Sequence, residues 1–219
     1  MRAPTECSNT MKITSESFND NDSVPGRNAF GIPDPDDHMA LGGNLNPQLS
    51  WSDVPVEACS LILFCIDPDV PSSADDVNQE GKVIPASLPR VDFFHWIMVD
   101  LPASDDGLAE GECSQEVTPG GKVNPAGPPG TRQGVNNYTD FLAGNKTMGG
   151  EYRGYDGPCP PWNDEILHHY HFRLYAIDLE KCPVEDGFRG PEVLSAIEGH
   201  VVAEAEIVGT YSLNPALSG

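Results

Sequence analysis

Four strand-length stretches with apolar residues at every position, or at every second one, most constrain what this chain can fold into. Ser60–Ile66 (SLILFCI) is apolar on both faces, and Phe93–Val99 (FFHWIMV) repeats that pattern. His169–Ile177 (HYHFRLYAI) alternates instead, and Ala203–Tyr211 is the last such stretch. A period of two is typical of β-strands, and a run that is apolar on both faces is typical of a strand inside a sheet. The sequence therefore predicts a mainly β protein.

Long segments rich in glycine and proline separate these strands. The chain has 22 glycines and 21 prolines in 219 residues, and the longest such segments are 26–47, 73–90 and 118–161. Only one helix is expected, with Pro191 in its first turn and Gly199 at its end. We expect a loose tail over residues 1–11 and a single domain over residues 12–213. This domain should be a sandwich of two antiparallel sheets with a short C-terminal helix.

Charge and hydropathy exclude several classes of partner. Lys and Arg number 12 against 34 Asp and Glu, giving a net charge of −22. Such a surface repels nucleic-acid phosphates and anionic lipid headgroups. A solvated acidic surface is the simplest interpretation, and a salty environment or a basic partner is the alternative. No apolar run of about 18 residues is present, so no stable membrane insertion is expected.

Cysteine usage and the first residues indicate a compartment. The six cysteines have no metal-type spacing, and two of them lie in apolar strand-like sequence, where they are expected to be small buried side chains. The N-terminal residues are polar throughout, without the apolar run of a secretion signal. We therefore expect a protein of the reducing cytoplasm, without a bound metal or cofactor.

Polar groups stand at the ends of the predicted strands. The first strand ends in Asp67 and Asp69, the second contains His95 among aromatic residues, and the third is entered through the proline loop GPCPP and His168. Each feature alone has a structural explanation: turn chemistry for the acids, a core histidine bound to a carbonyl, and prolines that stiffen a loop. His168 also shares the core-facing register with Tyr170, which places it at the rim of the core. We therefore expect these groups to converge on one small cavity.

Taken in order, these motifs resemble the phosphatidylethanolamine-binding protein family, and most of all its bacterial and archaeal branch, the Raf kinase inhibitor-like proteins. The matching segments are KITSESF, NLNPQLSWSDVP, CIDPDVPS, FFHWIMVDLP, GPCPPW, LHHYHFRLYAIDL and EGHVVAEAEIVGTYS. They span residues 12–212, nearly the whole chain. The resemblance implies a Greek-key sandwich of two antiparallel sheets with short helices, and a homodimer as in members of that branch.

The resemblance also implies a small anion-accepting pocket at one end of the sandwich. The pocket residues carried over by motif are Asp67, Asp69, Pro71, His95, Cys159, Pro160, His168 and Tyr170. Carboxylates beside the histidines would orient and charge the imidazoles, so that ring N–H groups face the anion. The long segment 73–90 and the acids in Trp162–Leu167 depart from the family pattern, and both weigh against a phospholipid headgroup as the ligand.

Two functions are compatible with these residues. The first is a non-catalytic binding or regulatory module for a small anion or a phosphorylated small molecule, with a kinase or a protease as its protein partner. The second is a hydrolase-type or other small-substrate enzyme, in which Asp67, His95 and His168 do acid–base work and Cys159 is the nucleophile. A purely structural interaction protein with a vestigial pocket is a third alternative. No G-x-S-x-G motif is present, and the binding module is favoured.

Overall fold

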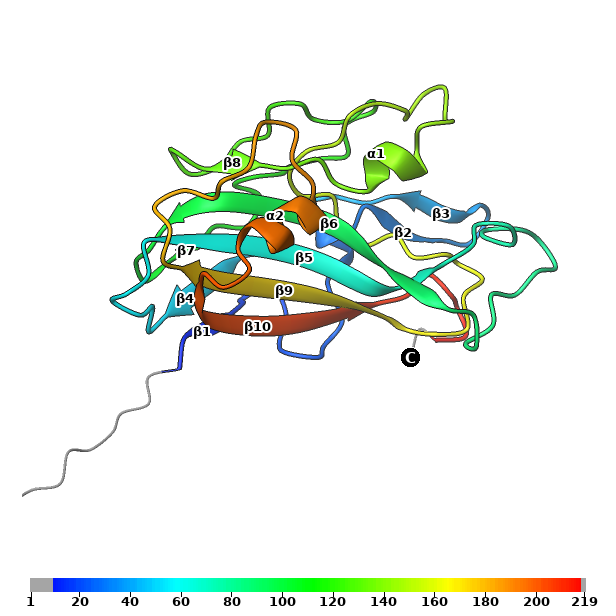
Figure 1. The fold of residues 1–219 in the computed structure, drawn as a ribbon. Coiled ribbons are helices and arrows are strands. Elements are labelled where there is room, and N and C mark those ends of the chain that lie inside the picture. Colours follow the sequence, from blue (N-terminus) through cyan, green and yellow to red (C-terminus); the bar gives the residue numbers. More distant parts are fainter. Residues whose placement is uncertain (1–9, 218–219) are drawn as a thin grey trace, which may run out of the picture.

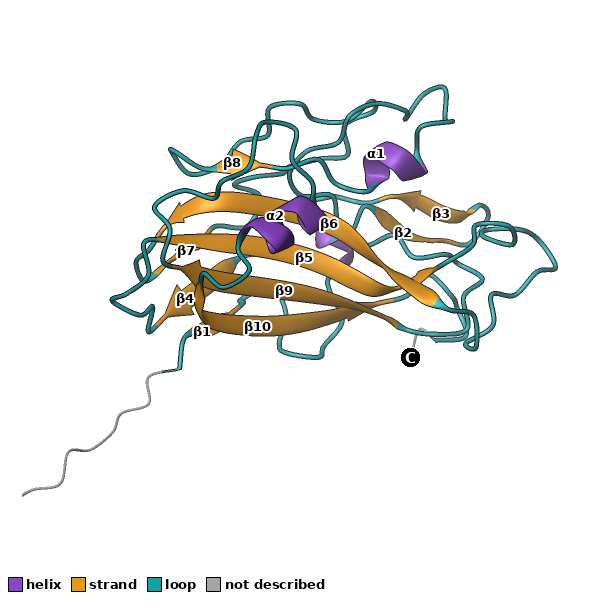
Figure 2. Ribbon diagram, viewed as in Figure 1, coloured by secondary structure: helices purple, strands orange, loops and turns teal. Residues whose placement is uncertain are grey.

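The chain folds into antiparallel β-sheets with two short α-helices (Figures 1 and 2). A computed structural model describes residues 10–217. The strands are β1 (Lys12–Thr14), β2 (Gly31–Asp34), β3 (His38–Leu41), β4 (Leu49–Ser52), β5 (Ser60–Pro71), β6 (Arg90–Pro102), β7 (Asp106–Leu108), β8 (Arg132–Gln133), β9 (His168–Ile177) and β10 (Val201–Tyr211). The helices are the 3-10 turn η1 (Gly26–Asn28), α1 (Tyr138–Phe141) and α2 (Gly190–Ala196). The mainly β class is confirmed.

The largest sheet has the strand order β10-β9-β5-β6-β8, and its pairs are antiparallel. Strand β5 lies at its centre, and its residues from Ser60 to Asp67 are all buried. The apolar run explains this position, because a strand that is covered on both faces must carry apolar side chains on both. The sheet therefore has two apolar faces that must each be covered.

Different elements cover the two faces of this sheet. On one face, Leu63 and Trp96 pack into a core with Leu49 and Trp51 of the three-stranded sheet β1-β4-β7. On the other face, a second core includes Val193 of α2, and Figure 1 shows α2 lying across the middle of the large sheet. The molecule is thus a sandwich whose second face is closed by a helix and loops.

Several elements differ from the sequence expectation. Strand β5 continues past the apolar run to Pro71, because its end pairs with the beginning of β6 at Arg90. The hairpin β2–β3 and helix α1 form within segments expected to be loops. A loose tail was expected over residues 1–11, of which residues 1–9 lie outside the described part of the chain. Met11 does not belong to a loose tail, because its side chain is buried in the core. No helix of residues 10–217 is long and apolar enough to cross a bilayer.

The pairing of the three long strands gathers the predicted polar residues at one end of the sheet. Strands β6 and β9 flank β5, and Asp67 pairs with Phe93, two residues before His95. On the other side, Ile66 pairs with His171, three residues after His168. Residues separated by about a hundred positions in the chain therefore lie within side-chain reach of each other.

Candidate functional site

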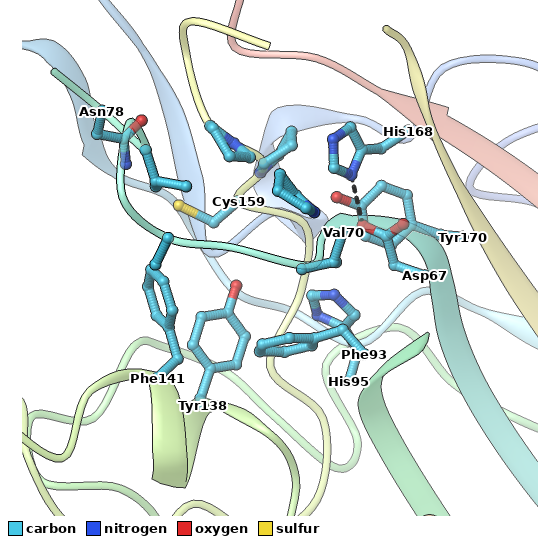
Figure 3. Close-up of a pocket in the computed structure, with 15 residues that line it drawn as sticks. Asp67, Val70, Asn78, Phe93, His95, Tyr138, Phe141, Cys159, His168 and Tyr170 are labelled. Atoms are coloured by element: carbon cyan, nitrogen blue, oxygen red, sulfur yellow. Dashed lines mark hydrogen bonds and ion pairs between the residues drawn. The ribbon is translucent and has the colours of Figure 1, made fainter. Parts of the chain in front are cut away.

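A cavity of about 120 Å³ opens at this end of the large sheet (Figure 3). Its walls come from β5, β6, β9, α1 and two loop segments. Seven of the eight predicted pocket residues line it: Asp67, Pro71, His95, Cys159, Pro160, His168 and Tyr170. The other lining residues are Val70, Ala74, Val77, Asn78, Phe93, Tyr138, Phe141 and Pro161.

Asp69 is the exception, because it does not line the cavity as predicted. Its carboxylate accepts the backbone N–H of His169 at 2.9 Å and lies 2.7 Å from that ring's Nδ1. Residues two apart share a face only in a regular strand. Here the register of β5 shifts between Asp67 and Val70, and Asp67 Oδ1 accepts the backbone N–H of Asp69 at 2.8 Å. The bend turns the second carboxylate away from the first.

His168 is held between two carboxylates. Its Nδ1 lies 2.7 Å from Asp67 Oδ2 and its Nε2 lies 3.2 Å from Asp164 Oδ2. Burial alone would lower the pKa of this imidazole, but hydrogen bonds to Asp164 and Asp67 outweigh it and raise the pKa to about 9. The ring is therefore an imidazolium at neutral pH, and both of its N–H groups donate to carboxylates.

Arg90 extends this arrangement into a chain of four alternating charges. Its two terminal nitrogens donate to Asp164 at 2.5 and 3.0 Å, in the bidentate geometry that fits a guanidinium to a carboxylate. Burial would raise the pKa of Asp164, but hydrogen bonds from His168 and Arg90 outweigh it and hold that pKa below its usual range. The chain Asp67–His168–Asp164–Arg90 is thus neutral overall. No group of three or more His, Cys, Asp or Glu side chains within residues 10–217 is arranged to hold a metal ion.

His95 has a different state. It is buried, and its Nδ1 lies 2.8 Å from the backbone carbonyl oxygen of Asp156. A carbonyl can only accept, so Nδ1 carries a proton. Burial lowers the pKa of this ring, although the charge of Asp67 acts in the opposite direction. At neutral pH the ring is therefore uncharged, and Nε2 carries a lone pair.

The two histidines therefore do not play the same part, contrary to the expectation that both would present N–H groups to a ligand. The N–H groups of His168 are already used, and its effect on the cavity is to hold Asp67 in place. His95 is the histidine with a ring nitrogen left for a ligand. The hydrogen bond from Nδ1 to the carbonyl of Asp156 fixes the orientation of the buried His95 ring. Its Nε2 can still gain or lose a proton.

The hydroxyl of Tyr170 is buried and has no hydrogen-bond partner among the described residues. A buried polar group without a partner costs about 1–3 kcal/mol. The ring of Tyr170 packs edge-to-face against His95, with centroids 5.1 Å apart. The neighbouring hydroxyl of Tyr138 instead donates to the carbonyl of Gly157 at 2.8 Å. Among the residues that line the cavity are thus one with an unsatisfied hydroxyl and, in ring contact with it, a neutral histidine.

Cys159 lines the cavity but is not activated. Burial raises the pKa of its thiol to about 12, so the thiolate is absent at neutral pH. Within residues 10–217, it forms no hydrogen bond to His168, whose two ring nitrogens are engaged by carboxylates. The geometry of Cys159 therefore provides none of the features of a nucleophile.

Sequence reasoning missed the aromatic side of the site and the far end of the charged chain. Phe93, Tyr138 and Phe141 form one group of rings at the cavity. The motif NNYTDFL places Tyr138 and Phe141 three residues apart, a spacing that brings side chains together on a helix. Because this motif lies in a segment rich in glycine and proline, a loop was expected there instead of a helix. Asp164 lies four residues before His168, and nothing local in the sequence links it to Arg90.

Residues 14–212 match the family described as phosphatidylethanolamine-binding protein. A UPF0098 protein of Methanothermobacter thermautotrophicus is 33% identical over 201 residues, which are 92% of this chain and 98% of the relative. The UPF0098 protein YbhB of Escherichia coli is 31% identical over 202 residues, which are 92% of this chain and 100% of that protein.

Two crystal structures are similar as well. The phosphatidylethanolamine-binding protein homolog CT736 from Chlamydia trachomatis matches with a TM-score of 0.62 and 31% identity, over 94% of this chain and 99% of that one. YbcL of E. coli, described as a member of the mammalian PEBP family, matches with a TM-score of 0.67 and 25% identity, over 92% and 98% of the two chains. By sequence and by structure, this chain belongs to the phosphatidylethanolamine-binding protein family.

Proposed function

We propose that the protein is a non-catalytic module that binds a small anion or phosphorylated small molecule in the cavity beside His95. The observation that carries this proposal is the buried, unpartnered hydroxyl of Tyr170, which lines the same cavity as the free Nε2 of His95. Native proteins rarely leave such a group unsatisfied without a ligand or a water to fill the position. Family membership supports a ligand-binding role in general.

Binding of an anion requires a proton at His95. The neutral ring offers a lone pair at Nε2, which would repel an anionic oxygen, whereas the imidazolium offers an N–H donor. Because burial lowers the pKa of this ring, the free protein is uncharged there at pH 7 and takes up one proton on binding. Affinity should therefore rise as the pH falls below 7. Few atoms make contact, so a bare anion should bind only in the millimolar range.

The geometry of Cys159 and His168 gives the enzymatic alternative no support. Cys159 is a protonated thiol without a base, and His168 has no free nitrogen to transfer a proton. Action on a kinase or a protease, a homodimeric state and a cytoplasmic location are supported by the family resemblance and by composition alone. They remain proposals for this chain.

A nuclear magnetic resonance titration tests the proposal. Acetate and inorganic phosphate are added separately to isotope-labelled protein at pH 6, and the ring carbon–proton resonances of the histidines are followed. The His95 resonance should move with saturation, whereas that of His200, which is exposed and paired with Asp178, should stay in place. If neither anion moves the His95 resonance at millimolar concentrations, the proposed function is wrong.

A further inference from the structure

We propose that the ligand is a small monocarboxylic acid with an apolar arm, preferably aromatic. Its carboxyl group lies between His95 and Tyr170, and its arm lies against Phe93 and Phe141. This inference rests on the proposed function and narrows it to one class of ligand. It follows from two properties of the cavity: which charges line it, and where its apolar side chains are.

The charges favour a single negative charge on the ligand. The charged groups lining the cavity are Asp67 and His168, and both N–H groups of His168 already donate to carboxylates. Arg90, the nearest further cation of this chain of charges, is committed to Asp164. A phosphate dianion would place a second negative charge close to Asp67 without a cation to offset it, and an uncompensated charge in a buried site is costly. A monoanion avoids this cost.

A carboxyl group also matches the number of hydrogen-bonding groups that remain. One of its oxygens shares a proton with His95 Nε2, and the other accepts the O–H of Tyr170, whose hydroxyl has no partner otherwise. Each of these two groups then has one partner, which is the condition for burying polar groups at low cost. A phosphate would bring further oxygens, and the remaining side-chain amide at the cavity is that of Asn78, an exposed residue whose Oδ1 accepts the backbone N–H of Trp162.

The rest of the cavity is apolar. Figure 3 shows Tyr138 and Phe141 on the side opposite to Asp67, His168 and Tyr170. The rings of Phe93 and Phe141 lie edge-to-face, with centroids 6.4 Å apart. Phe141 is 53% exposed. Further apolar lining comes from Val70, Val77 and three prolines. A bare anion would leave these surfaces in water, whereas an apolar arm would cover them.

The dimensions suit an arm of one ring. An enclosed cavity of about 150 Å³ in another protein accommodates benzene. This cavity measures about 120 Å³, so the carboxyl group and part of one ring lie inside it and the rest of the ring lies at its opening. Aromatic rings favour offset or edge-to-face contacts with other rings, as Phe93, Tyr138 and Phe141 already make with one another. A single ring attached to the carboxyl group extends this packing towards the opening of the cavity.

Calorimetric titration with benzoate and acetate provides the test. Both ligands have a carboxylate, but benzoate has a phenyl ring where acetate has a methyl group. Benzoate should bind at least about tenfold more tightly than acetate, given the apolar area it buries. Inorganic phosphate should bind more weakly than benzoate when both are measured at the same slightly alkaline pH, at which phosphate is mainly the dianion.

Two variants locate the parts of the ligand. Phe141→Ala should weaken benzoate by about fivefold or more and leave acetate unchanged, because Phe141 contacts only the arm. The matched control Val56→Ala removes an apolar side chain that is 95% exposed and away from the cavity, and should change neither ligand. Tyr170→Phe removes only the unpartnered hydroxyl, so it should weaken both carboxylates by about tenfold without lowering the stability of the free protein.

Each contrary outcome has a separate meaning. If acetate and benzoate bind equally and Phe141→Ala affects neither, the apolar arm is refuted and the proposed function stands. If phosphate binds and both carboxylates do not, the carboxyl head is refuted and the proposed function again stands. If none of the three binds, the proposed function fails together with this inference.

Discussion

Replacing His168 by Gln should remove a stabilising charge whose contribution depends on pH in a defined way. The pKa of His168 is raised from 6.5 to about 9 by its two carboxylate partners. Each pH unit between the folded and unfolded pKa corresponds to about 1.4 kcal/mol, so the pair of hydrogen bonds contributes about 3 kcal/mol to the free energy of unfolding. His168 is fully buried, so solvent screening reduces this figure little.

The sign follows from the direction of the shift. Below pH 6.5 the ring is protonated in both the folded and the unfolded chain, and the contribution is fully present. As the pH rises towards 9, the unfolded chain has lost this proton and the folded chain loses it too, so the contribution disappears. Gln cannot carry the charge, and His168→Gln leaves Asp67 and Asp164 buried with less compensation. The variant should therefore be about 3 kcal/mol less stable at pH 6, and the difference should shrink by pH 10.

Urea-induced unfolding followed by tryptophan fluorescence measures this difference at fixed ionic strength from pH 6 to pH 10. Cysteines and tyrosines also titrate at high pH, but they do so equally in both proteins and cancel in the difference. The control His200→Gln removes an exposed histidine paired with Asp178, and should change the unfolding free energy by less than about 0.5 kcal/mol. If wild type and His168→Gln give parallel curves against pH, the assignment of the charge to His168 is wrong.

Three further predictions concern the surroundings of the cavity. Gly157→Ala should destabilise the fold by about 2 kcal/mol or more, because a Cβ there would lie 2.1 Å from the carbonyl oxygen of Asn28; Gly144→Ala, with nothing within 4 Å, should be neutral by the same urea assay. Cys159 should react with a thiol reagent at pH 8 far more slowly than in urea-unfolded protein, since burial raises its pKa to about 12. Lys122→Met should cost about 3 kcal/mol of unfolding free energy, because it leaves the buried carboxylate of Asp156, now 2.7 Å from the Lys122 ammonium, without its cation.

Contrary results would be equally clear. Equal stabilities of the two glycine variants would show that the backbone near residue 157 can move aside. Rapid labelling of Cys159 in the folded protein, read by mass spectrometry, would reveal a thiolate and revive the enzymatic alternative. An unchanged unfolding curve for Lys122→Met would mean that Asp156 is neutral in the folded chain.

The strands that position the site could be predicted because each carries a strong apolar pattern. Ser60–Ile66 and Phe93–Val99 lie within β5 and β6, and His169–Ile177 is almost the whole of β9. The shortest strands have two residues (β8) or three (β1 and β7), which is too few to show a repeating pattern. Their pairing depends on long-range contacts that no local pattern records.

The structure brings most of the predicted residues to one cavity, but their protonation states did not follow from the sequence. Parity along the strand correctly placed His168 on the core-facing side, because alternation is a local property. The fate of Asp69 depended on a register shift in β5, which alternation cannot reveal. The charge on His168 depended on Asp164, which reaches the ring only through the path of a proline-rich loop. Protonation states therefore required the assembled structure.

The chain of charges from Asp67 to Arg90 has two roles: it joins β5, β6, β9 and the loop before β9, and two of its members, Asp67 and His168, also form the polar floor of the cavity. Evolution and engineering therefore have unequal freedom at the two ends of this site. Substitutions at the floor should destabilise the fold. Phe141 and Val77, which line the cavity but do not belong to the chain of charges, can be replaced without disturbing it. A change of ligand preference should therefore be easier to engineer at the rim of the cavity than at its floor.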